Sequence, residues 1–428
     1  MSRKKRLHPH LSYRDRADAL AHAAEAEPEP VPRHPLVCRG KVEMITSPDA
    51  LADFIEHLRS CGSFGYDSEF IGEMSYQPKV CLIQAATTRR VALIDPLGGL
   101  DVTPFWEILA DPGVEKIVHA GQQDLEPVVR YLGRAPASVF DVQIAAGFAG
   151  LAYPASLRRL VEELTGTRLG KGFTFTHWDR RPLSPMQQRY AADDVRYLPA
   201  VRCELARRLE ASGHAAWAAE ECAALCDMSV YKRSPADECL RMRGAGRLSP
   251  RQLAILRELS IWRDEAARRA DLPARTYVRD EVLTTLAKLA PASEEQLARI
   301  HGLPRPVRAG EGRNILAAIE RGRQAAPVDA ALCAESEESP QQRFAIDALW
   351  TAVQARCYAE GIDPALVCSR RDVARFYRRC CGEKLPDNSD DPLARGWRGA
   401  LLGDELRRFV EGSATLSLKW AGGRLAAQ

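Results

Sequence analysis

The chain has 428 residues, of which 46% are hydrophobic, and a formal net charge of +3. A single hydrophobic core stops growing at about 250–300 residues, so this length predicts two to four domains. No run of about 18 apolar residues occurs, and the N-terminal MSRKKRLHPHLSYRDR lacks the apolar core of a secretory signal. The sequence therefore excludes a membrane-spanning class. Twelve cysteines without framework spacing predict reduced thiols in a cytoplasmic protein.

Charge is unevenly distributed along the chain. Residues 41–140 contain 8 Lys and Arg against 14 Asp and Glu, a net of −6. Residues 241–324 contain 17 Lys and Arg against 10 Asp and Glu, a net of +7. An acidic region followed by a basic one predicts a cation-binding site beside a surface for a polyanion.

The first half of the chain alternates between strand and helix patterns. Residues 1–41 are predicted to be a disordered tail, basic at first and then rich in Ala, Glu and Pro. Ser47 and Pro48 are typical of the start of an amphipathic helix. Strands are then predicted at 65–70, 79–87, 90–96 and 115–120, with helices at 103–111 and 124–133. This order predicts a mixed α/β sheet with helices packed on it.

From residue 184 onward the pattern is helical. Residues 184–213 are predicted as one periodic helix that begins with a Ser-x-x-Gln capping box. The same device marks four helix starts in all: Ser184/Gln187, Ser249/Gln252, Ser293/Gln296 and Ser339/Gln342. We predict an α/β domain at 42–213, a connector at 214–247, a helical unit at 248–324, a linker at 325–340 and a last helical unit at 341–420.

Four acids and one tyrosine form the candidate site. Asp67 and Glu69 are two residues apart in a predicted strand and project from one face, where two like charges are costly unless a cation lies between them. Asp124 opens a helix that follows a strand, and Tyr190 and Asp194 share one helix face. Taken singly, each acid is equally explained by an exposed position or a helix start, and Tyr190 by a place in the core.

Together the four carboxylates suit hard divalent cations, which prefer oxygen ligands. Two such ions about 3.5–4 Å apart can stabilise both oxygens of a phosphodiester displacement. The phenol of Tyr190 would orient the attacking water or take its proton. A competing stretch, GTRLGKGF at 166–173, departs from a phosphate-binding loop, since its glycine interval is one residue short and Gly172 replaces the Ser or Thr. His214, Cys222 and Cys226 are better explained by helix packing than by a metal.

The motifs YDSEF, KIVHAGQQDL, FDVQIAAGF and RPLSPMQQRYAADDVRYL resemble the exonuclease motifs of the ribonuclease D family, the tyrosine subtype of the DEDD superfamily. The unit that begins LSPRQLAILRELSIWRDEAARR resembles an HRDC domain, and the one containing GWRGALLGDELRRFVEG is similar to a second HRDC-like domain. The resemblance implies a ribonuclease H-like mixed-sheet exonuclease domain followed by two all-α HRDC-type domains. The chain departs from the family at Ser68 and Val142, where Thr is commoner.

The resemblance also implies roles for individual residues. Asp67, Glu69, Asp124 and Asp194 would bind two divalent ions, Mg²⁺ or Mn²⁺, and Tyr190 would position the nucleophilic water. Asp141 and Gln143 would support the site or the 3′ nucleotide. Three residues before the last motif would contact phosphates or bases, although Trp178 is equally explained as core: Lys171, Trp178 and Arg181.

We therefore expect a cytoplasmic, monomeric 3′-5′ exoribonuclease that releases 5′-mononucleotides. Its expected substrates are tRNA precursors or other small structured RNAs, gripped by the basic helical units through shape and phosphate contacts. Two alternatives stay open at this point. One is a 3′-5′ DNA exonuclease with the same chemistry, and the other is a catalytically inactive RNA-binding scaffold.

Overall fold

The structure is a computed structural model of the chain. It describes residue 31 and the ranges 34–72, 74–170, 177–232, 234–328, 338–383, 392–403, 405–415, 417–421 and 424–427. Most of the tail predicted to be disordered therefore lies outside the described residues. Val37 and Cys38 are nevertheless buried in a hydrophobic core, so packing begins before the predicted start at residue 42.

A six-stranded mixed sheet forms the centre of the N-terminal domain, as predicted. Its strands are β1 (Glu43–Ile45), β2 (Ser63–Ile71), β3 (Lys79–Ala86), β4 (Val91–Ile94), β5 (Glu115–Val118) and β6 (Val139–Asp141), in the order β1-β4-β3-β2-β5-β6. Strand β3 is antiparallel to both β2 and β4, and the other three pairings are parallel. The central position of β2 places Asp67 and Glu69 in the middle of the sheet.

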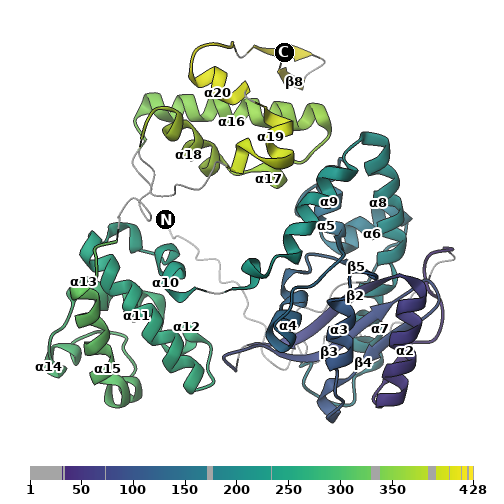
Figure 1. Cartoon of the computed structure of the whole chain (residues 1–428), viewed down its shortest axis with the longest axis horizontal. Helices are drawn as coiled ribbons and strands as arrows, with labels where there is room; N and C mark the ends of the chain where they lie inside the picture. The colour runs from purple at the N-terminus through teal and green to yellow at the C-terminus, as the bar shows by residue number, and fades with distance from the viewer. Residues whose placement is uncertain are drawn as a thin grey trace, which may run out of the picture.

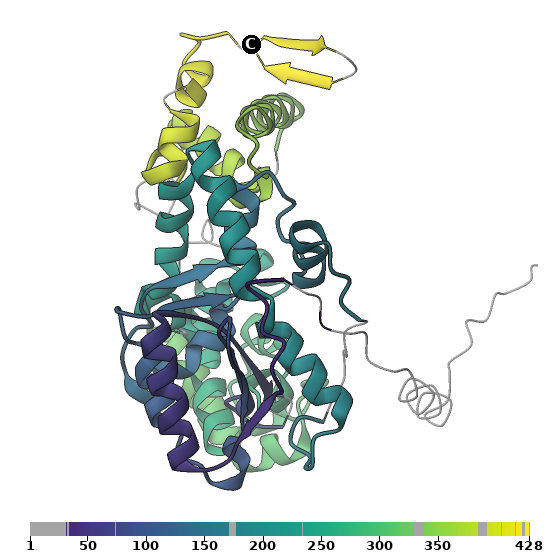
Figure 2. The same ribbon diagram turned by 90° about the vertical axis from the view of Figure 1, so that its right-hand side faces the viewer.

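Helices cover both faces of this sheet (Figures 1 and 2). One face carries α2 (Pro48–Cys61), α3 (Thr103–Leu109) and α4 (Gln122–Leu132). The other side carries α7 (Pro185–Arg196) and α8 (Leu198–Ser212), with α5 (Val142–Phe148), α6 (Leu157–Thr165) and α9 (Ala215–Ala223) packed around them. In Figure 2 the purple helix α2 and the teal helix α7 lie on opposite sides of the strands.

The alternation along β2 separates the two faces. Phe64 and Tyr66 are buried in the core beneath α2 and α3, whereas Gly65 and Asp67 face α7 and α8. A Cβ on Gly65 would lie 2.7 Å from the carbonyl oxygen of Val195 and 2.9 Å from Cβ of Leu198. Only glycine therefore allows the two helices to approach β2 this closely.

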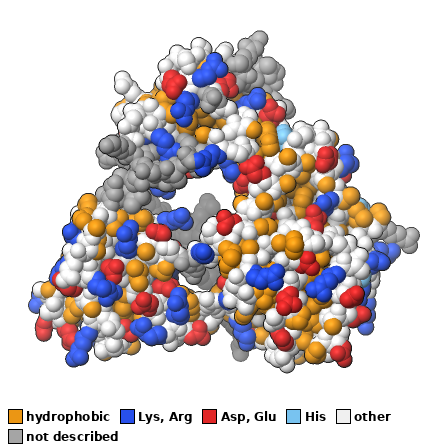
Figure 3. All heavy atoms as spheres, viewed as in Figure 1, with side chains coloured by type: hydrophobic (Ala, Val, Ile, Leu, Met, Phe, Trp, Pro, Cys, Tyr) orange, Lys and Arg blue, Asp and Glu red, His pale blue; other side chains and the backbone are white. Residues whose placement is uncertain are grey.

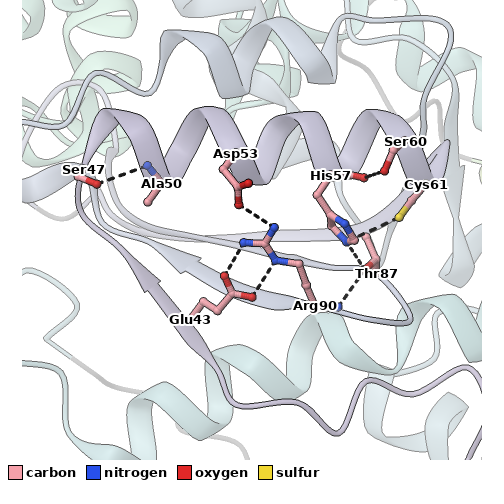
Figure 4. A network of polar contacts seen from close by, with 9 residues as sticks. All are labelled: Glu43, Ser47, Ala50, Asp53, His57, Ser60, Cys61, Thr87 and Arg90. Atoms are coloured by element: carbon pink, nitrogen blue, oxygen red, sulfur yellow. Dashed lines mark hydrogen bonds and ion pairs between the residues drawn. The ribbon is translucent and has the colours of Figure 1, made fainter.

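Arg90 fastens α2 and the edge strand β1 to the sheet (Figure 4). Its guanidinium donates to both carboxylate oxygens of Glu43, at 2.9 and 2.6 Å, and to Asp53 of α2 at 2.9 Å. At the other end of α2, Nε2 of His57 lies 2.9 Å from Oγ1 of Thr87. Because these ion pairs are partly exposed, they contribute little to the free energy of folding. Their main effect is to fix the position of α2.

The predicted single helix at 184–213 is wrong in one respect. It divides into α7 and α8 at Tyr197, two residues before Pro199. Proline lacks an N–H and its ring clashes with the preceding turn, so a helix does not run straight through it. The division lets α7 lie across β3 and β4 while α8 packs near β5.

The predicted helix starts are confirmed, with one difference in detail. Complete capping boxes occur at Ser184, Ser249 and Ser339. At Ser293 the side chain accepts from the backbone of Gln296, but the Gln296 amide oxygen accepts from Ala292 instead of the cap residue. Among the described helices a fourth complete box, which was not predicted, pairs Ser369 with Asp372.

The next unit is helical and has a core of its own. It consists of α10 (Pro235–Glu238), α11 (Pro250–Arg269), α12 (Ala274–Tyr277), α13 (Asp280–Leu289), α14 (Glu294–Leu297) and α15 (Arg305–Gln324). Cys239, Met242 and Ala245 belong to this core, whereas Ala218 and Cys222 belong to the α/β domain. Packing thus shortens the connector predicted at 214–247.

The last unit combines helices with a small hairpin. Its elements are α16 (Pro340–Glu360), α17 (Pro364–Val367), α18 (Arg370–Cys380), α19 (Gly396–Leu402), α20 (Glu405–Val410), β7 (Leu418–Ala421) and β8 (Arg424–Ala427). The antiparallel pair β7 and β8 was not predicted, and it lies mostly beyond residue 420, where the predicted helical unit ends. The helical periodicity used for the prediction ends with the last helix, so it gave no information on this short segment.

The last unit shares a hydrophobic core with the α/β domain. The Trp397 ring packs edge-on against Phe148 with centroids 4.6 Å apart, and its Nε1 donates to Glu221 at 2.7 Å. Arg398 forms a two-pronged ion pair with the same Glu221, at 2.8 and 2.9 Å. The two parts are therefore joined by buried apolar contact as well as by charge.

The middle helical unit contacts the α/β domain through Tyr76, in the loop between β2 and β3. The Tyr76 hydroxyl donates to Asp264 of α11 at 2.7 Å, and its backbone N–H donates to Asp271 at 3.0 Å. Arg268 donates to the same hydroxyl and lies over the Tyr76 ring.

The three lobes surround an opening with Lys and Arg side chains along its edge (Figure 3). In the described part of the chain, no helix has the length and apolar character needed to cross a membrane.

Candidate active site

Three of the predicted acids meet at the centre of the sheet. Asp67 and Glu69 come from β2, and Asp194 comes from α7, which lies across the same face. Each offers a carboxylate oxygen, and the three oxygens lie within 4.8 Å of one another. All three residues are half-buried. A β-bulge follows between Glu69 and Phe70, as is common beside active sites.

The fourth acid, Asp124, approaches from the first turn of α4. Its Oδ1 accepts from the Ser68 hydroxyl at 2.7 Å and from the Ser68 backbone N–H at 3.2 Å. The hydroxyl of Tyr66 donates to the Asp124 carbonyl oxygen at 2.6 Å. Asp124 is thus held against β2 between the positions of Asp67 and Glu69, although its oxygens do not belong to the group of three.

The carboxylates of this cluster raise one another's pKa values. Burial raises the pKa of Asp67 well above its usual range, and the charges of Asp124, Asp194 and Glu69 raise it further. Burial and the nearby Asp194 raise the pKa of Glu69 to about 8. Burial also raises the pKa of Asp194 to about 8, with Asp193 adding to the effect. Four close carboxylates disfavour each other's ionised forms, and a divalent cation relieves that repulsion.

Asp124 is perturbed less than the other acids. Burial raises its pKa to about 6, while the hydrogen bonds from Ser68 act in the opposite direction. These bonds favour the ionised form because both groups donate to the carboxylate. The donor set is made of oxygen atoms alone, which fits Mg²⁺ or Mn²⁺ better than a softer metal.

Tyr190 lies beside this cluster, one turn before Asp194 on α7. Its hydroxyl is hydrogen-bonded to the Asp194 carboxylate. Burial raises the pKa of this phenol, and the charges of Asp194, Glu69 and Asp67 raise it further. The phenol is therefore protonated at neutral pH and can donate a hydrogen bond.

Asp193 is not solvent-facing, contrary to prediction. It is half-buried, accepts from Arg189 at 2.6 Å and pairs with the buried Arg196 at 3.3 Å. Its direct neighbour Asp194 faces the sheet instead. Adjacent acids on α7 therefore have different surroundings.

Asp141 holds the turn before α4, and its predicted support of the site or of the 3′ nucleotide stays a prediction. It caps α5 and accepts from the backbone N–H groups of Ala120, Gly121, Gln143 and Ile144. This fixes the turn that leads into α4, where Asp124 lies. The Gln143 amide donates to the Ala155 carbonyl at 3.1 Å, and Nε2 of His119 lies 2.8 Å from the same oxygen.

Trp178 and Arg181 occupy structural positions. The Trp178 ring is buried with Leu82 and Ala191, near Tyr190. Arg181 forms an ion pair with Asp95 and donates to the carbonyl oxygens of Cys81 and Trp178. Contact of either residue with a substrate stays a prediction. Lys171 lies outside the described residues.

Sequence reasoning gave no role to Ser68 or Tyr66, which position Asp124. Ser68 was noted only as a departure from the usual Thr. Its place between two candidate ligands was a usable signal, because a hydroxyl there keeps the same hydrogen-bonding group that Thr has.

The comparisons with known proteins agree with this geometry. Residues 42–210 match the model of the 3′-5′ exonuclease family, and residues 252–319 match the HRDC domain. A ribonuclease D from Gluconacetobacter diazotrophicus is 36% identical over 88% of this chain and 94% of its own length. The ribonuclease D of Escherichia coli K12 is 34% identical over 86% of this chain and 98% of its own length. The chain belongs to the ribonuclease D family.

Structural similarity supports the same assignment. The crystal structure of Escherichia coli ribonuclease D, described as an exoribonuclease involved in structured RNA processing, matches with a TM-score of 0.76. The match has 32% identity and covers 88% of this chain and all of that one. The catalytic core of RRP6 from Trypanosoma brucei shares the fold, with a TM-score of 0.52 at 21% identity.

This ribonuclease D family member is a 3′-5′ exoribonuclease, with a mixed α/β exonuclease domain followed by a helical HRDC region. It acts on RNA, and its HRDC domain binds nucleic acid. The family uses divalent metal ions, and Asp67, Glu69 and Asp194 form an acidic cluster suited to one.

Proposed function

We propose that this member of the ribonuclease D family trims the 3′ ends of small structured RNAs, such as tRNA precursors, with two divalent ions bound to its acidic cluster. The observation that carries the proposal is the convergence of Asp67, Glu69 and Asp194, with their oxygens within 4.8 Å. We assign one ion to these three carboxylates. The second is assigned to Asp67 and Asp124, which approaches from the opposite side of β2.

When bound, such ions stabilise the negative charge that develops on the attacking and leaving oxygens of a phosphodiester. The side chains of the protein orient the attacking water and position the metal ligands. The Tyr190 hydroxyl, whose proton is donated to Asp194, accepts a hydrogen bond from the attacking water and so orients it. Ser68 and Tyr66 keep Asp124 in place, and Asp141 fixes the turn before it.

The helical units supply the proposed grip on RNA. The exonuclease domain is acidic and the 248–324 unit is basic, so the phosphate backbone is attracted to the helical side of the molecule. Exposed arginines of that unit are available for such contacts: Arg279, Arg299, Arg305 and Arg313. Binding through phosphates should weaken steeply as salt increases.

The experiment is cleavage of a tRNA precursor labelled at its 5′ end, compared with an unstructured RNA and a DNA of equal length. We expect stepwise shortening from the 3′ end of RNA in Mg²⁺ or Mn²⁺, and none with chelator. Asp67→Asn should abolish cleavage while RNA binding persists, because it removes a ligand from both ions. Faster shortening of DNA than of RNA would contradict the substrate assignment.

Two further variants separate the roles of the acids on α7. Asp194→Asn should abolish cleavage, whereas Asp193→Asn should keep it and lower only the melting temperature, since Asp193 pairs with Arg189 and Arg196. Tyr190→Phe should lower kcat by about 10²-fold with little change in KM, as expected for loss of a group that orients the attacking water. Equal loss of activity in the Asp193 and Asp194 variants would contradict the assignment.

A further inference from the structure

Gln84 of β3 is a buried polar residue that the mechanism above leaves unused. Its exposed fraction is 0%, and among the residues that the structure describes neither its amide nitrogen nor its amide oxygen has a hydrogen-bond partner. The large majority of buried side-chain polar atoms in proteins are paired, and an exception points to water, an ion or a function. In Gln84, both the nitrogen and the oxygen of one amide are without a hydrogen-bond partner in the described part of the chain.

The register of the sheet places Gln84 beside the acidic cluster. It stands directly opposite Asp67 in the antiparallel pair of β2 and β3. Residues opposite one another in such a pair project from the same face, with Cβ atoms about 4.5–5.5 Å apart. That face is covered by α7, which carries Asp194. Gln84 therefore lies beside β2 and beneath α7, the two elements that supply the candidate ligands.

Packing alone does not account for this amide. Its flanking and opposing neighbours on the same face include the apolar residues Leu82 and Leu93. An unbranched apolar side chain of similar length would fill the same space without leaving two polar atoms unpaired. A carboxylate, by contrast, can use the donor that an amide nitrogen offers.

We propose that Gln84 is a positioning residue for the metal site: in the loaded enzyme its amide nitrogen donates to the Asp67 carboxylate and holds it in the metal-binding orientation. This inference rests on the proposed function, because it takes Asp67 as a ligand. Side chains that orient metal ligands in this way typically change metal affinity or activity by about 10–100-fold when they are replaced.

The test compares Gln84→Met with the wild-type full chain in two measurements. Calorimetric titration with Mn²⁺ should show affinity weakened by about 10-fold or more. Thermal unfolding of the metal-free protein should show an unchanged or higher melting temperature, because the variant removes two unpaired buried atoms. Gln84→Leu repeats both measurements with a differently shaped side chain. Ile83→Val, on the opposite face of the same strand, controls for repacking and should leave Mn²⁺ affinity unchanged.

Each outcome of these measurements either supports or overturns the role proposed for Gln84. Wild-type Mn²⁺ affinity in both Gln84 variants overturns the proposal. So does a marked loss of metal-free stability in both, since the amide would then be contributing to the fold before metal binds. Asp67→Asn in the same titration separates the two levels of inference. If that variant binds Mn²⁺ as wild type does, the proposed function fails; if it does not and Gln84→Met does, only the role of Gln84 fails.

Discussion

Ser68 illustrates how one hydroxyl can hold a proposed metal ligand, here the carboxylate of Asp124. Ser68→Ala removes the 2.7 Å bond to Asp124 but leaves the backbone bond intact. We expect cleavage to fall by about 10–100-fold, as for other residues that orient metal ligands, with the fold retained. Ser68→Thr keeps the hydroxyl and should retain activity. Steady-state cleavage of a labelled RNA measures both, and equal activity in Ser68→Ala and wild type would show that Asp124 needs no such support.

The raised pKa values predict how pH affects the metal-free protein. Glu69 and Asp194 have pKa values near 8 and Asp124 near 6, all above the value of about 4 expected in the unfolded chain. The folded state therefore holds these protons more tightly. Their contribution to stability is fully present below about pH 4 and is lost as pH rises through 6 to 8.

Divalent ions should reverse this loss because they bind the ionised carboxylates. The rise in melting temperature on adding Mg²⁺ should be larger at pH 8 than at pH 6, and chelator should abolish it. Asp67→Asn serves as the control and should show little Mg²⁺ effect at either pH. A Mg²⁺ effect that is independent of pH would mean that the ion binds away from these acids.

At the residue scale, the sequence identified the acids but not what surrounds them. Period-two alternation placed Asp67 and Glu69 on one face, and helical spacing placed Tyr190 beside Asp194. The same spacing could not show that Asp193 pairs with buried Arg196. Such partners depend on tertiary packing, which local periodicity does not encode.

The separation between β2 and the helices above it depends on Gly65. In Gly65→Ala the added methyl would meet the Val195 carbonyl and Leu198, so α7 must shift and carry Asp194 with it. We expect loss of most activity with helical content retained, measured by RNA cleavage and circular dichroism. Gly98→Ala, where nothing lies within 4 Å of the new Cβ, should be neutral. Full activity in Gly65→Ala would show that the position of α7 tolerates displacement.

At the scale of whole elements, helix starts were easier to predict than helix ends. Caps are local, so a Ser and a Gln three residues apart are enough to place a start. The break at Tyr197 was missed because apolar periodicity continues across Pro199. A stricter reading of that proline would have separated α7 from α8.

The relation of the HRDC domain to the catalytic strand depends on Tyr76, in the loop that directly follows β2. Tyr76→Ala removes its contacts with Asp264 and Arg268. We expect a larger radius of gyration by small-angle X-ray scattering and weaker binding of structured RNA. Cleavage of a short oligonucleotide should change little. Tyr358→Ala, an exposed tyrosine of α16, is the control. An unchanged radius with normal binding of structured RNA would show that Tyr76 does not set the domain arrangement.

The arrangement of the lobes is where sequence reasoning reached least far. Composition separated an acidic from a basic region, and motifs separated the domains. Contacts such as Tyr76 with Asp264, or Trp397 with Glu221, join residues nearly two hundred positions apart. Individually they carry no pattern, so neither the shared core nor the opening in Figure 3 was predicted.

The central claim is that four carboxylates from β2, α4 and α7 form one metal site. Anomalous diffraction from a crystal soaked in Mn²⁺ tests it most directly. We predict one peak among Asp67, Glu69 and Asp194 and a second between Asp67 and Asp124, both absent in Asp67→Asn. Mn²⁺ bound elsewhere, with these carboxylates left without an ion, would contradict the account.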